Sequence, residues 1–339
     1  MARPTKYNKI TSPEKLAKVN PNNKTLTKDF LDYLKSTHRS EGTIKGYAND
    51  LDIFWVWVME NLDNKNFVDV TKRELVRFQN WLVEENENSP ARVRRIKSTL
   101  SSLSNYIEAI LDEEEEFKDF RSIVRKIESP ALQPVRERTV WKESELVDLL
   151  DTLTEKGLIE HACFVALGMY SGRRKSELLR FKVSDFDDDK LVCDNALYKS
   201  EPILTKGHKM LECFTLAKKF KPYFDRWMEY RVEHDIQSEW LFPDPAHPDV
   251  PRNVSTITPW TDMFTRITGR DFYVHSLRSY YTTSLLRAGI PDNVVVEIIG
   301  WASSEMLKIY DDTPKDEKIS SYFKNGDIFI PESKDLSDL

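Results

Sequence analysis

Apolar residues recur at helical intervals through the first third of the chain. Between residues 44 and 58 they lie three or four positions apart, which is the spacing of one face of an amphipathic helix. Other signals predict a short helix around residues 30–34, a third helix opened by a capping box at 71–74, and a fourth begun by Ser89-Pro90. Four helices in about 90 residues predict a small all-α bundle.

The second half of the chain predicts more helices and one β-hairpin. Residues 203–205 and 210–216 have strand character, and the turn between them, Lys206-Gly207-His208-Lys209, contains glycine. Apolar patterns elsewhere predict helices at residues 143–153, 159–170, 217–234, 276–287, 293–299 and 303–310. We therefore expect a mainly α protein, in which the four-helix bundle precedes an α+β domain with a small antiparallel sheet.

Composition divides the chain into five segments. Residues 1–24 are basic and have no apolar period, which predicts a flexible arm. The helical bundle should then occupy residues 25–128, and a stretch of prolines and mixed charges predicts a linker at 129–139. The second domain should follow over residues 140–323, and residues 324–339 should form a C-terminal tail.

The net charge of −6 does not exclude a nucleic-acid ligand, because the charge is unevenly distributed. Two acidic runs, at residues 111–119 and 185–189, hold the excess of negative charge, and the rest of the chain carries +3. No stretch is apolar enough to span a membrane, and the N-terminus lacks the apolar core of a secretory signal. The three cysteines have no metal-ligand spacing, so we expect a soluble cytoplasmic protein.

A dense group of cations opens the helix that Ser89-Pro90 begins. Arg92, Arg94, Arg95 and Lys97 lie within six residues and have no acidic residue between them. A solvated surface explains such density poorly, whereas contact with a nucleic-acid backbone explains it well. We therefore predict that these four residues bind DNA, together with Lys45 on the helix of residues 44–58.

Further cations stand at helix starts and in a turn of the second domain. Arg174 and Glu177 are three residues apart, so on a helix the carboxylate can orient the guanidinium. His275 and Arg278 have the same spacing and should project towards one point. The remaining candidates are a lysine in the hairpin turn and two aromatic residues nine positions apart: Lys206, Trp301 and Tyr310.

The order and local sequence of these candidates resemble the tyrosine recombinase (phage integrase) family, in particular its Cre-like and Xer-like two-domain members. The stretch Ser171-Gly172-x-Arg174-x-Ser176-Glu177-Leu178 is similar to the first arginine motif of the family, and His275-x-Leu277-Arg278 is similar to the second. Gly300-Trp301, followed by Tyr310, is similar to the end of the site, with Trp301 where most members have histidine. Residues 43–54 are similar to the helical core-binding domain.

The resemblance implies a site-specific recombinase that cleaves and rejoins DNA through a 3′-phosphotyrosyl link and needs no cofactor. It implies that Tyr310 is the nucleophile, that two arginines hold the phosphate and that Glu177 supports the first of them. The catalytic set is then Arg174, Lys206, His275, Arg278, Trp301 and Tyr310. Three substitutes stay open: Arg173 for the first arginine, and Lys199 or Lys209 for the lysine.

The same resemblance carries expectations about assembly and about related activities. Family members close around double-stranded DNA as a C-shaped clamp, with a SAM-like bundle on one side, and work as tetramers on two DNA sites. We expect the apolar positions from Ile319 to Ile330 to dock on a neighbouring protomer. Two other activities would use the same fold: relaxation of supercoils, as in type IB topoisomerases, or DNA binding without catalysis.

Overall fold

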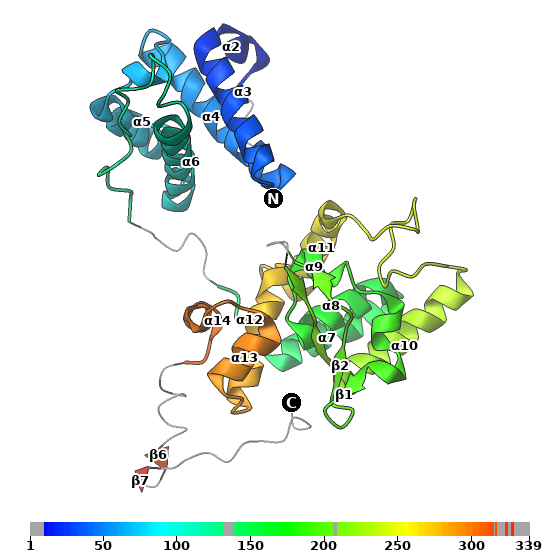
Figure 1. Ribbon diagram of the computed structural model, residues 1–339. Coiled ribbons are helices and arrows are strands. Elements are labelled where there is room, and N and C mark those ends of the chain that lie inside the picture. The colour runs from blue at the N-terminus through cyan, green and yellow to red at the C-terminus, as the bar shows by residue number, and fades with distance from the viewer. Residues whose placement is uncertain are drawn as a thin grey trace. The chain divides into compact units, whose positions relative to one another are not determined.

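The computed structural model describes residues 10–131, 138–205, 209–314, 316, 323–324 and 327–328 (Figure 1). The chain forms two compact units, Met1–Glu137 and Arg138–Leu339. Each has its own hydrophobic core. The boundary between the units falls inside the segment that the sequence predicts to be a linker.

The N-terminal unit is a helical bundle. Its elements are the helices α2 (Pro13–Lys18), α3 (Pro21–Ser36), α4 (Glu41–Asn61), α5 (Lys72–Glu84) and α6 (Pro90–Ile110), with a 3₁₀ turn η1 (Phe67–Asp69). The capping box at Thr71 and the cap at Ser89 begin α5 and α6 as predicted. Helix α4 lies at the centre, because its second half is buried on all sides. There Phe54 packs edge-on against Phe67 and Phe78.

The prediction of a flexible arm over residues 1–24 is wrong for residues 10–24, which are folded against the bundle. Ser12-Pro13 and Asn20-Pro21 begin α2 and α3, and the Ser12 and Asn20 side chains accept backbone N–H groups of the first turns. Val19, between the two helices, is buried in the core. Lysines interrupt the apolar period of this segment, so the period does not predict helices there. The N-cap residues Ser12 and Asn20 nevertheless start them. Residues 1–9 lie outside the described part of the chain.

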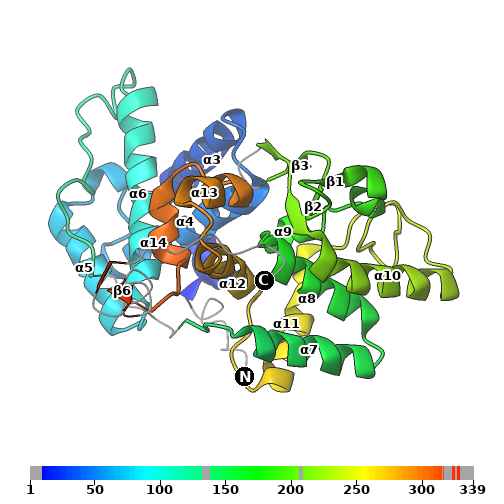
Figure 2. The same ribbon diagram turned by 90° about the horizontal axis from the view of Figure 1, so that it is seen from below.

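The second unit is built around α8 (Ile159–Ser171), which is buried along almost its whole length. Helices α7 (Glu143–Glu155), α10 (Ala217–Glu233) and α12 (Val274–Arg287) pack around it, as Figures 1 and 2 show. The remaining helical elements are α9 (Lys175–Leu178), η2 (Val183–Phe186), η3 (Asp188–Lys190), η4 (Val254–Ile257), α11 (Thr258–Thr268), α13 (Asp292–Ile299), η5 (Ser304–Met306) and α14 (Leu307–Tyr310).

Short antiparallel strands complete this unit. Strands β1 (Leu191–Val192), β2 (Leu197–Lys199) and β5 (Phe214–Leu216) form a sheet in the order β1-β2-β5. Strands β3 (Ile203–Leu204) and β4 (Met210–Leu211) pair as the predicted hairpin, with Ile203 opposite Leu211. A mainly α fold with a small antiparallel sheet is therefore confirmed.

The C-terminal region holds one further described pair of strands, β6 (Phe323–Lys324) and β7 (Asp327–Ile328). Most of residues 315–339, and with them most of the segment expected to dock on a neighbouring protomer, lies outside the described residues. Among the helices that the structure describes, none is long and apolar enough to cross a membrane.

Candidate active site

The first arginine motif lies at the turn between α8 and α9. Helix α8 ends at Gly172, which adopts a left-handed conformation (φ 61°). A side chain there would be strained, and its Cβ would come within 2.5 Å of the Tyr281 ring. The reversal places Arg174 at the N-cap of α9, one turn before Glu177.

Arg174 and Glu177 form the contact that their spacing predicts. Arg174 Nη1 donates to Glu177 Oε1 at 2.8 Å, and the Arg174 backbone N–H donates to the other carboxylate oxygen at 3.0 Å. Glu177 is almost completely buried, whereas about a third of the Arg174 side chain is exposed (34%). Glu177 thus orients the Arg174 guanidinium from the protein interior, and the remaining N–H groups of the guanidinium can face a ligand.

Arg173, the open alternative to Arg174, is committed to the protein interior. It is fully buried and donates to backbone carbonyls of Ser171, Ile298 and Ile299. The last two carbonyls are at the C-terminus of α13, whose helical hydrogen bonds end there. Arg173 therefore fastens α13 to the α8–α9 turn, and of these two adjacent arginines Arg174 is the one whose side chain is partly exposed.

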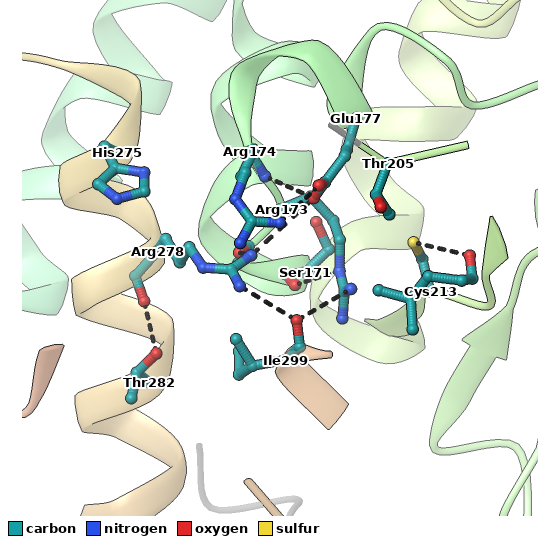
Figure 3. Close-up of polar contacts among 12 residues, drawn as sticks. Ser171, Arg173, Arg174, Glu177, Thr205, Cys213, His275, Arg278, Thr282 and Ile299 are labelled. Atoms are coloured by element: carbon teal, nitrogen blue, oxygen red, sulfur yellow. Dashed lines mark hydrogen bonds and ion pairs between the residues drawn. The ribbon is translucent and has the colours of Figure 1, made fainter. Parts of the chain in front are cut away.

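Arg278 joins the same cluster from α12. Its guanidinium is buried and donates to the carbonyls of Gly172 (3.0 Å) and Ile299 (3.1 Å), so two arginines converge on Ile299 (Figure 3). Burial, together with the cations Arg174 and Arg173, lowers the pKa of Arg278 to about 9. Its Nε has no hydrogen-bond partner among the described residues.

Tyr310, at the end of α14, lies against His275 and Trp301. The Tyr310 hydroxyl is hydrogen-bonded to His275 Nε2, and the Tyr310 ring centre is 4.9 Å from that of Trp301. Trp301 also contacts Arg278, whose guanidinium carbon is 5.3 Å from the Trp301 ring centre. Burial, and secondarily Arg278 and Arg174, lower the pKa of His275, so its ring is neutral at pH 7.

Trp301 carries a buried indole N–H without a partner among the described residues. Buried donors in proteins are rarely left unsatisfied, and each such donor needs an explanation. Here two of them, Trp301 Nε1 and Arg278 Nε, occur in neighbouring side chains. An acceptor with several oxygens, placed beside the guanidinium groups, would satisfy both.

Lys206 lies outside the described residues, so its position is not compared with the rest of the cluster. The hairpin that carries it does approach the site, because Leu211 on β4 packs against Gly300, the residue before Trp301. Of the two substitutes, Lys199 is paired with Glu212 at 2.9 Å on β2. The other, Lys209, is exposed beside the hairpin turn.

The cations predicted to bind DNA from the N-terminal unit are not equivalent. Arg92 and Arg95 both pair with Asp50, a buried carboxylate, but Arg92 is 15% exposed and Arg95 is 58% exposed. Lys97 donates to the Ile127 carbonyl and to Ser129 (3.1 Å), and burial lowers its pKa. Arg92 and Lys97 are the two of the five cations that are half-buried, and their internal partners explain their presence.

Lys45 and Arg94 are more accessible than these two. Lys45 is exposed on α4, and Arg94 is exposed while its Nε donates to the Pro130 carbonyl at 2.9 Å. With Arg95 they are the three predicted DNA contacts whose charged groups face solvent.

Comparison with known proteins assigns the chain to a family. Residues 139–317 match the phage integrase family, and residues 26–114 match the N-terminal SAM-like domain of phage integrases. The first match covers more than half of the chain and contains the whole cluster described above. The chain belongs to the phage integrase family. Its members are the tyrosine recombinases, and the chain is a tyrosine site-specific recombinase.

Individual relatives agree with this assignment. A tyrosine recombinase of Thermosipho africanus is 24% identical over 303 residues, which are 87% of this chain and 97% of the relative. The fold is similar to that of a XerH site-specific recombinase bound to a palindromic difH substrate after cleavage (TM-score 0.64, 18% identity, 82% and 78% of the two chains). It is also similar to a lambda integrase tetramer on a Holliday junction (0.63, 16%, 85% and 76%). The comparisons do not favour a relaxing enzyme or a silent DNA-binding protein.

One contact of this recombinase site was missed from the sequence. Arg138 reaches the end of α14 and contacts Asp312, two residues after Tyr310. The sequence offers only a weak signal, because Arg138 stands in a run of alternating charges that is typical of a linker. Its partner is 174 residues away, so no local pattern links the two.

Proposed function

We propose that this recombinase cleaves a DNA strand by attack of the Tyr310 hydroxyl on phosphorus, leaving a 3′-phosphotyrosyl link and a free 5′-hydroxyl. The observation that carries the proposal is the continuous contact from the Tyr310 phenol through Trp301 to Arg278. A phenol and a guanidinium that flank the same indole can reach one phosphate, with the nucleophile on one side of it. The 5′-hydroxyl of a partner strand then attacks the link and releases Tyr310.

Arg174 and Arg278 hold the non-bridging oxygens in this proposal. Their charges offset the negative charge that grows on those oxygens in the transition state. A metal ion has this role in other phosphoryl-transfer sites. The N–H groups of Arg278 Nε and Trp301 Nε1, which lack partners among the described residues, gain phosphate oxygens as acceptors. Glu177 keeps Arg174 oriented towards the phosphate.

Two proton transfers accompany the attack. His275 is hydrogen-bonded to the Tyr310 hydroxyl and, being neutral, can accept the phenol proton as the oxygen bonds to phosphorus. Lys206, at the hairpin turn, donates a proton to the departing 5′-oxygen. That assignment is supported by the place of Lys206 in the family's order of catalytic residues and by the contact of β4 with Gly300.

The N-terminal unit is proposed to contact the phosphate backbone through exposed cations, Lys45, Arg94 and Arg95. By analogy with the DNA-bound relatives, we also propose that the two units close around double-stranded DNA, that four protomers assemble on two sites and that the enzyme acts on cytoplasmic, nucleoid-associated DNA. The C-terminal segment from Ile319 onward is proposed to dock on the neighbouring protomer.

A covalent-trapping experiment tests the proposal. The purified protein is mixed with DNA from the ends of a mobile genetic element, and the mixture is denatured and digested. The peptide that carries DNA is then identified, along with the attached strand. We expect the peptide to contain Tyr310, attached through the 3′ phosphate. Tyr310→Phe should give no adduct on a nicked suicide substrate built from that strand, while binding the DNA as tightly as the wild type. An adduct of undiminished yield with Tyr310→Phe would refute the assignment.

A further inference from the structure

Arg138 is the first described residue of the second unit, and its guanidinium holds the end of α14. Nη1 donates to the Ile309 carbonyl and to Asp312 Oδ1, the latter at 3.3 Å. Nη2 is 3.4 Å from the Ser279 hydroxyl on α12. The contacts therefore bracket Tyr310 in the chain, one residue before it and two residues after it.

The carbonyls at this end of α14 have no N–H donor inside the helix. Because a helix leaves its last carbonyls without intrahelical donors, they must be satisfied from elsewhere. Arg138 serves Ile309, and the Thr283 hydroxyl donates to the Tyr310 carbonyl at 3.3 Å. The Asp312 backbone N–H donates to the same hydroxyl at 3.1 Å. The Ile309 and Tyr310 carbonyls and the Asp312 N–H are thus held by Arg138 or by Thr283 of α12.

Arg138 is itself held by its neighbours in the chain. The Thr139 hydroxyl donates to the Asp271 carbonyl at 2.8 Å, just before α12. Trp141 Nε1 donates to the Ser276 hydroxyl at 2.8 Å, and Ser276 follows His275. The segment that carries Arg138 is therefore fastened to the helix that carries His275, so Arg138 links two parts of the site that the chain separates.

Stability alone does not explain this arrangement. The Arg138 side chain is 45% exposed, and ion pairs at such exposure contribute little to folding. Its guanidinium carbon is 5.9 Å from the Tyr310 ring centre, close enough to restrict the ring but without a hydrogen bond to the hydroxyl among the described contacts. The contacts suit a residue that sets where the phenol points.

We infer that Arg138 is a positioning residue for the nucleophile: by fixing the Ile309 carbonyl and Asp312 to α12, it keeps the Tyr310 hydroxyl in line with the scissile phosphate. The inference rests on the proposed role of Tyr310. A displacement of about 1 Å at a reacting atom can cost on the order of 100-fold in rate, so loss of Arg138 should be visible in the chemical step.

The test measures strand cleavage in a single turnover, with enzyme and DNA at saturating concentrations, alongside the Kd for the same DNA. Arg138→Ala should cleave about 10- to 100-fold more slowly while its Kd stays within about twofold of wild type. Arg138→Lys keeps the charge on a single donor nitrogen, so it should recover part of the rate. The matched control is Lys221→Ala, since Lys221 is 51% exposed, pairs with Asp225 at 2.8 Å and stands on the same unit. It should cleave at the wild-type rate.

Each other outcome overturns the inference. A wild-type cleavage rate for Arg138→Ala means that α14 needs no such anchor. Equal losses in Arg138→Ala and Lys221→Ala, with equal falls in melting temperature, mean a general effect on folding. A weaker Kd with an unchanged saturated rate means that Arg138 binds DNA. Cleavage by Tyr310→Phe would remove the proposed function itself, and is measured separately on the same substrate.

Discussion

Arg173 and Arg174 are adjacent in the chain but have opposite surroundings. Arg173 is fully buried and donates to three backbone carbonyls, so its charge serves the fold. Arg174 has one buried carboxylate partner and an accessible guanidinium, so its charge is available to a phosphate. The same side chain chemistry thus does structural work at one residue and proposed catalytic work at the next.

Lysine substitutions should separate the two arginines. Arg173→Lys keeps the charge but cannot reach all three carbonyls, so the free energy of unfolding should fall by about 2 kcal/mol. Arg174→Lys should change it by less than about 1 kcal/mol, because Arg174 is partly exposed and its charge remains beside Glu177. Cleavage by Arg174→Lys should fall about 100-fold, since a lysine cannot present a bidentate fork.

The measurements are urea unfolding and single-turnover cleavage at a temperature where both variants are folded. The opposite pattern, with stability lost in Arg174→Lys and cleavage lost in Arg173→Lys at unchanged stability, would show that Arg173 holds the phosphate.

The pH dependence of cleavage should report His275. Burial and the neighbouring arginines lower the pKa of His275 below its ordinary value of 6.5, so the ring stays neutral and can accept the Tyr310 proton at pH 7. The cleavage rate should therefore be level from pH 8 to about 6.5 and fall at lower pH, as His275 becomes protonated. His275→Gln should slow cleavage by about 100-fold and remove this acid limb.

His161 provides the control for this pH profile. Its ring centre lies 4.1 Å from that of Trp260 in the same unit, and burial lowers its pKa to about 4. His161→Gln should leave the acid limb where it is. For both histidines the depressed pKa also means that stability is lost as the pH falls from 6.5 through the lower folded-state value, because the unfolded chain takes up the proton first. Rates must therefore be compared only where the protein is folded.

At the scale of elements, helix ends place the site. Helix α8 delivers Arg174 because it stops at Gly172, and α13 delivers Trp301 because it stops at Gly300, both with positive φ. Helix α12 packs against both α8 and α13 and supplies His275 and Arg278 from one face. The candidate cluster is thus assembled from two glycine-terminated helices and the end of α14, beside one continuous helix.

Alanine at Gly172 should be more harmful than alanine at a glycine with the same φ in open space. Gly172→Ala combines left-handed strain with a Cβ 2.5 Å from the Tyr281 ring, so we expect a loss of about 3 kcal/mol in unfolding free energy. Gly157→Ala, at φ +70° with nothing within 4 Å, should lose only about 1 kcal/mol. Urea unfolding measures both, and equal losses would mean that the Tyr281 contact carries no weight.

At the scale of the whole molecule, the chain has two separate hydrophobic cores. Leu103 is buried in the core of the N-terminal unit and Leu167 in that of the second unit. Two cores of this kind allow the units to unfold separately.

Core truncations should therefore act within one unit only. Leu103→Ala should cost about 2 to 5 kcal/mol and raise amide hydrogen exchange within residues 10–131, and Leu167→Ala should do the same within residues 138–314. Hydrogen exchange followed by mass spectrometry resolves the two regions. Loss of protection in both units from either single substitution would show that they unfold as one.

The features that could be predicted from the sequence are local ones. The amphipathic period of α4, the capping box at Thr71 and the cap at Ser89 each depend on residues within one or two turns. The Arg174–Glu177 pair is of the same kind. The order of the candidate catalytic residues was also legible, because each lies in a short motif, and it led to the correct family.

Only the tertiary structure decided between equivalent local readings. Arg173 and Arg174 are alike in sequence until α13 supplies its carbonyls, 126 residues away from Arg173 in one of these contacts. Residues 1–24 predict an arm because they are basic and show no apolar period, but residues 10–24 are helical where they pack against the core. Arg138 became visible only through Asp312. The physical reason is common to all three: propensity and capping act over a few residues, whereas burial and charge pairing depend on which distant segments the fold brings together.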